Sequence, residues 1–258
     1  MKKLDVILRY LVPPHCPLCG ETLDVSDVRT LCGACREKWD AVLRETCDKC
    51  GAPARRCLCR PGELTRRENV TLLSLYFYHH YDSERLGDRL LFTVKRQDEH
   101  PALPFLANEL SALLCEHAGT YHLSLRHWVI TYPPRSADAR HEYGFDQAHD
   151  LAKAVGKACG MTFLELIARA GGTEQKTSGD RTENAAAAFR RKRNMVIPDV
   201  VDGIVLLDDM VTSGATAARC IDLLRAERPH LPVIVLSAAK AQPHTKTENK
   251  PADEPWFL

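Results

Sequence analysis

Hydrophobic residues follow different patterns on the two sides of residue 62. The first part has few large apolar residues, whereas the second alternates short apolar runs with stretches whose apolar residues recur every three or four positions. The runs predict β-strands and the recurring pattern predicts amphipathic helices. Strands are predicted at 70–81, 128–132, 203–207 and 231–237, and helices at 83–96, 103–117, 147–159 and 215–225. This alternation predicts right-handed βαβ units, and therefore an α/β fold with a mostly parallel sheet flanked by helices.

Two stretches of the second part are ambiguous in pattern. Residues 162–168 fit neither element, and 70–81 is compatible with one strand or with a hairpin.

The two ends of the chain differ from its middle. Residues 1–15 predict a short amphipathic helix rather than a signal peptide, because Asp5 and Arg9 interrupt the apolar run. Residues 241–258 are rich in Pro, Lys, Thr and Glu and are predicted to be disordered. Their last residues, Trp256-Phe257-Leu258, fit an incidental tail, a tail that packs back on the domain, or a docking peptide.

Length and charge narrow the class of protein. The 258 residues suffice for one or two domains. With 35 Lys and Arg against 34 Asp and Glu, no overall field draws the molecule to nucleic acid or an anionic membrane, so such binding requires a local patch. No apolar run approaches the ~18 residues of a membrane span. A cytoplasmic protein is expected.

Cysteines are concentrated in one short segment. Eight of the 11 fall between residues 16 and 59, in three CxxC pairs and one CxC pair. Two thiolates on a tight turn reach one tetrahedral Zn²⁺ at about 2.3 Å, and a second such turn completes its shell. A reducing compartment and an odd cysteine total disfavour disulfides. The predicted ligands of two structural zinc ions are Cys16, Cys19, Cys32, Cys35, Cys47, Cys50, Cys57 and Cys59.

The spacing leaves the zinc pairing open. Sequential sites and cross-braced sites use the same eight residues, and neither leaves a coordination position for catalysis. The other three cysteines, Cys115, Cys159 and Cys220, look incidental. A turn-rich segment at 60–63 marks the expected boundary, which gives a double zinc ribbon at 16–62 and an α/β domain at 63–240.

The candidate chemistry of the α/β domain lies at 204–216, where a continuous apolar run is followed by two acids and a loop of small residues. Asp208 and Asp209 are expected at the carboxyl end of a buried strand, and the next helix begins near Ala215. A helix N-terminus presents backbone N–H groups to an anion. Carboxylates beside such a cradle suit a ligand with hydroxyls and phosphate, such as a sugar phosphate. The P-loop and dinucleotide patterns are both absent.

This segment closely resembles the 5-phosphoribosyl-1-pyrophosphate (PRPP) motif of type I phosphoribosyltransferases. The resemblance implies that Asp208 and Asp209 hold the ribose hydroxyls and are the catalytic carboxylates, and that Mg²⁺ accompanies PRPP. It also implies a phosphate-binding loop made of Met210, Val211, Thr212, Ser213, Gly214, Ala215 and Thr216.

A second motif narrows the resemblance to the competence protein F (ComF) family. Residues 130–147 are similar to that family's strand, Pro, Arg, then R-x-x-G-F-N-Q run, with Asp146 in place of the usual Asn. Segments 90–95 and 181–189 and the double zinc ribbon also match. The resemblance implies pyrophosphate-binding cations at Arg135, Arg140 and Lys95.

Three functions from different classes are compatible with these features. The resemblance implies a PRPP-binding competence factor that handles internalised single-stranded DNA and contacts a DNA-uptake helicase. The alternatives are an active phosphoribosyltransferase with an unknown acceptor and a regulator that senses PRPP. Basic clusters at 55–56, 60, 66–67 and 190–193 fit a phosphate backbone or a solvated face, and Trp39 is the ribbon aromatic available for base stacking. The sequence leaves the oligomeric state undecided.

Overall fold

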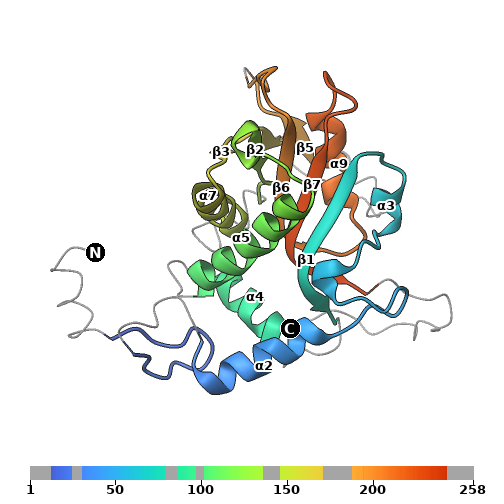
Figure 1. Ribbon diagram of the computed structural model, residues 1–258. Helices are drawn as coiled ribbons and strands as arrows, with labels where there is room; N and C mark the ends of the chain where they lie inside the picture. Colours follow the sequence, from blue (N-terminus) through green and yellow to red (C-terminus); the bar gives the residue numbers. More distant parts are fainter. Residues whose placement is uncertain are drawn as a thin grey trace, which may run out of the picture.

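A five-stranded sheet lies at the centre of the computed structural model, in which residues 13–24, 31–79, 86–96, 102–135, 146–170, 188–193 and 195–242 are described (Figure 1). The strand order is β1-β7-β6-β2-β3 and every pair is parallel. The strands are β1 (Val70–Tyr78), β2 (Trp128–Thr131), β3 (Thr162–Phe163), β6 (Gly203–Val211) and β7 (Val233–Ala241). The predicted α/β fold with a mostly parallel sheet is confirmed.

Helices cover both faces of this sheet (Figure 1). On one side lie α4 (Leu86–Arg96), α5 (Ala102–Thr120) and α7 (Gln147–Cys159), and on the other lie α3 (Gly62–Thr65) and α9 (Ala215–Leu224). Alternate residues of β6 enter the two cores: Val205 and Leu207 join the first, Ile204 and Leu206 the second. Burial on both faces explains the uninterrupted apolar run in this strand. Among the described residues, no helix is long and apolar enough to cross a membrane.

Shorter elements complete the chain. Two antiparallel strands, β4 (Ile167–Arg169) and β5 (Phe189–Arg191), form a separate pair. The ambiguous stretch 162–168 therefore contains β3 and the start of β4. The cysteine-rich segment contributes α2 (Gly33–Arg44) and η1 (Ala54–Arg56), and η2 (Leu125–His127) precedes β2.

The central strands run further than their apolar pattern predicts. β6 continues to Val211, four residues past the predicted end, and β7 reaches Ala241. Backbone pairing carries both onward, with Asp208 opposite Ser237 and Val211 opposite Lys240, because ladder hydrogen bonds do not depend on apolar side chains. β1 is a single strand parallel to β7 rather than a hairpin.

The cysteine-rich segment packs against the carboxyl ends of the central strands, and α2 runs along this edge (Figure 1). Trp39 on α2 is fully buried, with its ring centroid 5.8 Å from that of Tyr76 and 5.4 Å from that of Phe105. Its indole N–H donates to Glu109 on α5 at 3.4 Å. The prediction that Trp39 is available for base stacking is wrong, because this ring forms the contact between the segment and the α/β core.

Polar contacts reinforce the same junction. The buried Lys240 ammonium at the end of β7 donates to the Cys57 carbonyl at 2.7 Å. Gln242, two residues on, donates to the Thr46 carbonyl at 3.0 Å, and His79 after β1 pairs with Glu45 after α2. The segment is therefore tied to the last residues of two strands.

Candidate functional site

The eight candidate zinc ligands form two clusters that follow the chain order. In each cluster the four sulfur atoms lie within 4.8 Å of one another. The first contains Cys16, Cys19, Cys32 and Cys35, and the second contains Cys47, Cys50, Cys57 and Cys59. Of the two pairings that the spacing allowed, the structure has the sequential one, and both clusters fit a structural Cys₄ zinc site.

The first turn of each cluster is built in the same way. Gly20 N–H donates to the Cys16 carbonyl at 2.9 Å, and Gly51 N–H donates to the Cys47 carbonyl at 2.8 Å. Both glycines have positive φ, +76° and +71°, a conformation in which an L side chain is strained. These turns bring the two sulfur atoms of a CxxC pair to one point.

The crowding of the thiols shifts their pKa values in opposite directions. In the second cluster a hydrogen bond from the Ala52 backbone lowers the pKa of Cys50 to about 7. Burial, followed by the hydrogen bond with Cys50, raises the pKa of Cys59 to about 12. Several thiolates cannot share so small a volume without a positive charge between them, and a divalent cation would supply it.

The acidic pair lies in the last residues of β6 and lines a cavity of about 210 Å³. Asp208 and Asp209 are half-buried, and the Asp209 N–H donates to the Asp208 carboxylate at 2.9 Å. The opposite walls come from residues 133–135, the start of α7 and the β4–β5 pair. Carboxylates from the central strand thus face groups from three other elements.

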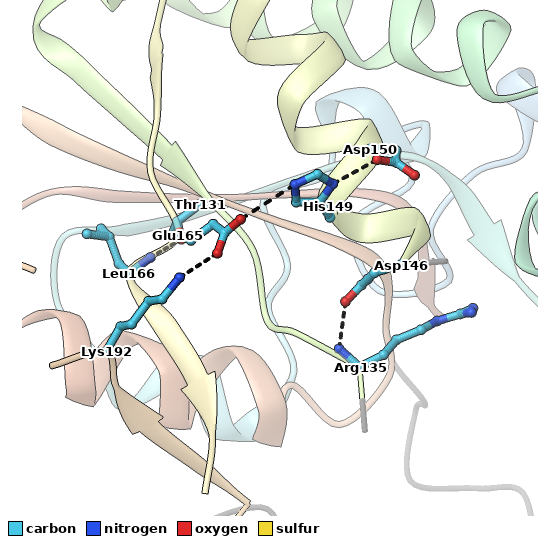
Figure 2. Close-up of polar contacts among 8 residues, drawn as sticks. All are labelled: Thr131, Arg135, Asp146, His149, Asp150, Glu165, Leu166 and Lys192. Carbon is cyan, nitrogen blue, oxygen red and sulfur yellow. Dashed lines mark hydrogen bonds and ion pairs between the residues drawn. The ribbon is translucent and has the colours of Figure 1, made fainter. Parts of the chain in front are cut away.

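Arg135 reaches these carboxylates through Gln147, the first residue of α7. The Arg135 guanidinium donates to the Gln147 side-chain oxygen at 2.6 Å, and the Gln147 amide donates to Asp209. The backbone N–H of Arg135 donates to Asp146 at 2.9 Å, which fixes the chain after β2 against the N-cap of α7 (Figure 2). The guanidinium, the amide and the carboxylate are therefore linked by hydrogen bonds in a row along the cavity wall.

A smaller hollow of about 40 Å³ adjoins the cavity and is formed by the loop between β6 and α9. Its lining runs from Met210 to Ala217 together with Asp208. Gly214 is the N-cap of α9 with φ +79°, and the Ala215 N–H at the start of the helix donates to the Ser213 hydroxyl at 3.4 Å. The first N–H groups of α9 and the hydroxyls of residues 212, 213 and 216 are donors suited to one phosphate group.

Pro61, at the end of the cysteine-rich segment, and the helix α3 that follows it support the back of this loop. A Cβ atom at Gly214 would lie 2.9 Å from Cγ of Pro61 and 3.0 Å from Cγ of Leu64. Leu64 is fully buried in the core that also contains Val211. The turn at 60–63, predicted as a domain boundary, therefore leads directly into a helix that packs beneath the loop.

The β4–β5 pair supplies the far wall of the cavity. Arg169 donates through Nε to the Pro134 carbonyl at 3.0 Å, and its guanidinium lies 4.3 Å from the ring centroid of Phe189. Lys192 and His149 both contact Glu165, at 2.6 and 3.7 Å, and so join the base of this pair to α7 (Figure 2). These contacts hold the far wall at a fixed position across from the acidic pair.

Several residues of the basic clusters form contacts within the protein. Arg60 donates to the carbonyls of Arg67 and Val70, and Arg67 forms a bidentate pair with Asp222 at 2.6 and 2.8 Å. In the last cluster, Arg191 pairs with Glu227. These arginines stabilise the fold and contribute less to a continuous basic surface than their spacing in the sequence indicates.

The predicted site residues are only partly described. Arg135, the two carboxylates and the loop 210–216 come together around the two cavities. Arg140 lies outside the described residues, as does the side chain of Lys95 in α4. Sequence reasoning gave no role to Gln147, although the family motif includes it, and it missed Arg169, which lies at the end of the ambiguous stretch.

The protein therefore belongs to the class that joins two Cys₄ clusters to a parallel α/β domain. The central strand of that domain carries an acidic pair, and the loop after it can enclose one small anion. The double zinc ribbon domain family matches residues 7–65 of this chain. The chain is also 28% identical over 207 residues to competence protein ComFC of Bacillus subtilis (strain 168), covering 74% of this chain and 77% of that protein. Together, the two matches support the assignment to the competence protein F family that the sequence motifs predict.

Proposed function

We propose that the protein binds PRPP with Mg²⁺ at the carboxyl end of β6 and acts in DNA uptake during natural transformation. The observation that carries the proposal is that two cavities adjoin, with Asp208, Met210 and Thr216 in the lining of both. The larger one places Asp208 and Asp209 against Arg135, and the smaller one is a donor-lined hollow the size of a phosphate group.

Each part of the site has a distinct task in this proposal. Asp208 and Asp209 accept hydrogen bonds from the ribose hydroxyls, and the loop 210–216 donates to the 5-phosphate. Arg135 offers a guanidinium to the pyrophosphate group, a geometry that suits bidentate contacts. The Asp208 and Asp209 carboxylates offer oxygen ligands of the kind that Mg²⁺ prefers, and a bound Mg²⁺ would neutralise part of the ligand's negative charge.

The competence role rests on the similarity to a known relative. The relative named above is a competence protein, and the double zinc ribbon domain family matches residues 7–65 of this chain. We infer a cytoplasmic factor that handles internalised single-stranded DNA together with a DNA-uptake helicase. The zinc thiolates of such a factor require a reducing compartment.

Replacing both carboxylates by amides tests the site. The Asp208→Asn, Asp209→Asn double variant loses two charge-assisted acceptors, so we expect PRPP affinity in the presence of Mg²⁺ to fall roughly 10- to 100-fold in isothermal titration. Asp202→Asn is the matched control, because Asp202 precedes the same strand at its other end and is exposed. Unchanged affinity of the double variant, with normal zinc content, would remove the ribose assignment.

A working phosphoribosyltransferase is the second candidate. The cavity extends past the carboxylates to Arg169 and Phe189, which leaves room beside the ribose position. In a transfer reaction the carboxylates would stabilise positive charge on the ribose while Arg135 stabilised the departing pyrophosphate. Pyrophosphate release measured in the same titration samples, with and without single-stranded DNA, separates the two: steady release indicates an enzyme, and binding without release indicates a PRPP-dependent DNA-handling factor.

A further inference from the structure

Two cysteines outside the zinc clusters lie next to each other. The sulfur atoms of Cys115 and Cys159 are 3.6 Å apart. Cys115 lies on α5 and Cys159 is the last residue of α7, and these helices pack side by side (Figure 1). A disulfide bond is about 2.05 Å long, so small side-chain rotations close the gap.

The remaining cysteines are committed elsewhere. Eight belong to the two zinc clusters, and Cys220 on α9 is fully buried. Cys115 is exposed and Cys159 is half-buried, so the pair can be reached from solvent. Of the three cysteines that looked incidental in the sequence, two therefore form a pair of thiols in direct contact with each other.

We propose that Cys115 and Cys159 form a reversible disulfide by exchange with a low-molecular-weight disulfide such as glutathione disulfide. The Cys115 thiolate attacks one sulfur of the small disulfide, whose S–S bond breaks and releases one thiolate. Cys159 then loses its proton and attacks the Cys115 sulfur, which releases the second thiolate. The protein loses two electrons and two protons, and the small disulfide becomes two thiols.

The surroundings of the two thiols determine the order in which they react. Burial, followed by the hydrogen bond with Cys115, raises the pKa of Cys159 to about 12. Cys159 also contacts the Ser111 carbonyl at 3.9 Å, one helical turn before Cys115 on the same face of α5. The exposed Cys115 is therefore the group that meets the oxidant, and Cys159 is already in place to resolve the mixed disulfide.

The bond would join two helices with different tasks. α5 contacts the cysteine-rich segment through Glu109 and Glu116, whereas α7 begins at Gln147 in the candidate site. The loop that the bond closes contains β2 and Arg135. Closing it restricts the unfolded chain, so we expect the midpoint of thermal unfolding to rise by roughly 5 °C or more.

The test uses the full-length, zinc-loaded protein and glutathione disulfide. After incubation, free thiols are alkylated, the protein is digested and peptides are identified by mass spectrometry. We expect a peptide pair linked through Cys115 and Cys159, lighter by two hydrogen atoms than the separate peptides and separated again by dithiothreitol. Zinc content, measured in the same samples, should stay constant while the unfolding midpoint rises.

Single substitutions test the order of the two exchange steps. Cys159→Ser should stop the reaction at a glutathione adduct on Cys115, and Cys115→Ser should remove both the adduct and the rise in unfolding midpoint. A lasting glutathione adduct on Cys115 of the unaltered protein, alkylation of both thiols after the treatment, or a link to a zinc-cluster cysteine before this one forms would each overturn the proposal.

Discussion

Gln147 lies between a guanidinium and a carboxylate, and it contacts both through the two ends of one neutral amide. The side chain is almost completely buried, so its hydrogen bonds are made in a medium where lost partners are costly. An amide carries both an acceptor oxygen and donor N–H groups, so it can accept from Arg135 and donate to Asp209 at the same time. This residue thereby sets the spacing between the candidate pyrophosphate and ribose contacts.

Changing the charge of this residue should uncouple the two contacts. In Gln147→Glu the new carboxylate still accepts from Arg135 but faces Asp209, so the like charges raise the pKa of one of the pair. We expect PRPP affinity at pH 8 to fall roughly tenfold, and to recover as the pH falls to 6 and one proton restores the donor. Titrations across this range measure the effect.

Gln147→Met is the matched control, since it has similar volume and no charge. Its affinity should fall without gaining the pH dependence. Identical pH profiles for the glutamate and methionine variants would show that Gln147 fills space rather than positions the charges.

At the scale of elements, the phosphate-binding loop rests on α3. Gly214→Ala should destabilise the protein twice over, because φ is +79° and because the new methyl group meets Pro61 and Leu64. Gly160 has φ +69° with no atom within 4 Å of such a methyl group, so Gly160→Ala reports the backbone strain alone. We expect Gly214→Ala to lower the free energy of unfolding by about 1 kcal/mol more than Gly160→Ala in urea titrations, and to weaken PRPP binding when Gly160→Ala does not. Equal losses in the two variants would contradict the proposed support of the loop by α3.

Elements with strong periodicity were predictable from the sequence, and those defined by backbone pairing were not. Residues 147–159 form the predicted helix, because an amphipathic pattern ended by Gly160 leaves few alternatives. The last residues of β6 were not predicted as strand, because Asp208 and Asp209 interrupt the apolar run while their backbones pair with β7. Arg169 was missed because β4 has three residues, too few to show a period.

Candidate chemistry was predictable where it lies in one continuous segment. The acidic pair, the loop and the cysteine pairs are local in sequence, and the structure brings each set together. The contact between Arg135 and the acidic pair through Gln147, the support of Gly214 by Leu64 and the proximity of Cys115 to Cys159 join distant segments. Such contacts depend on the fold, and local spacing carries no signal for them.

At the scale of the whole molecule, the two zinc clusters differ in how they contact the candidate site. The second cluster is followed by Pro61 and Leu64 beneath the loop, and its Cys57 carbonyl accepts from Lys240, which lies opposite Val211 in the sheet. The first cluster is packed instead with the core on the α5 side of the sheet. Loss of metal from the second cluster should therefore perturb the phosphate-binding loop, whereas loss of metal from the first cluster should leave the loop unchanged.

Removing one exposed ligand from each cluster tests this difference. Cys50 and Cys19 are both exposed, so serine at either position removes a metal ligand with little change in packing. We expect each variant to retain about one zinc ion, Cys50→Ser to bind PRPP roughly 3- to 30-fold more weakly, and Cys19→Ser to bind it as the unaltered protein does. Metal analysis and isothermal titration on the same samples give both quantities. An equal loss of affinity in the two variants would mean that zinc supports the fold as a whole, because only a local connection predicts that the loop responds to one cluster and not to the other.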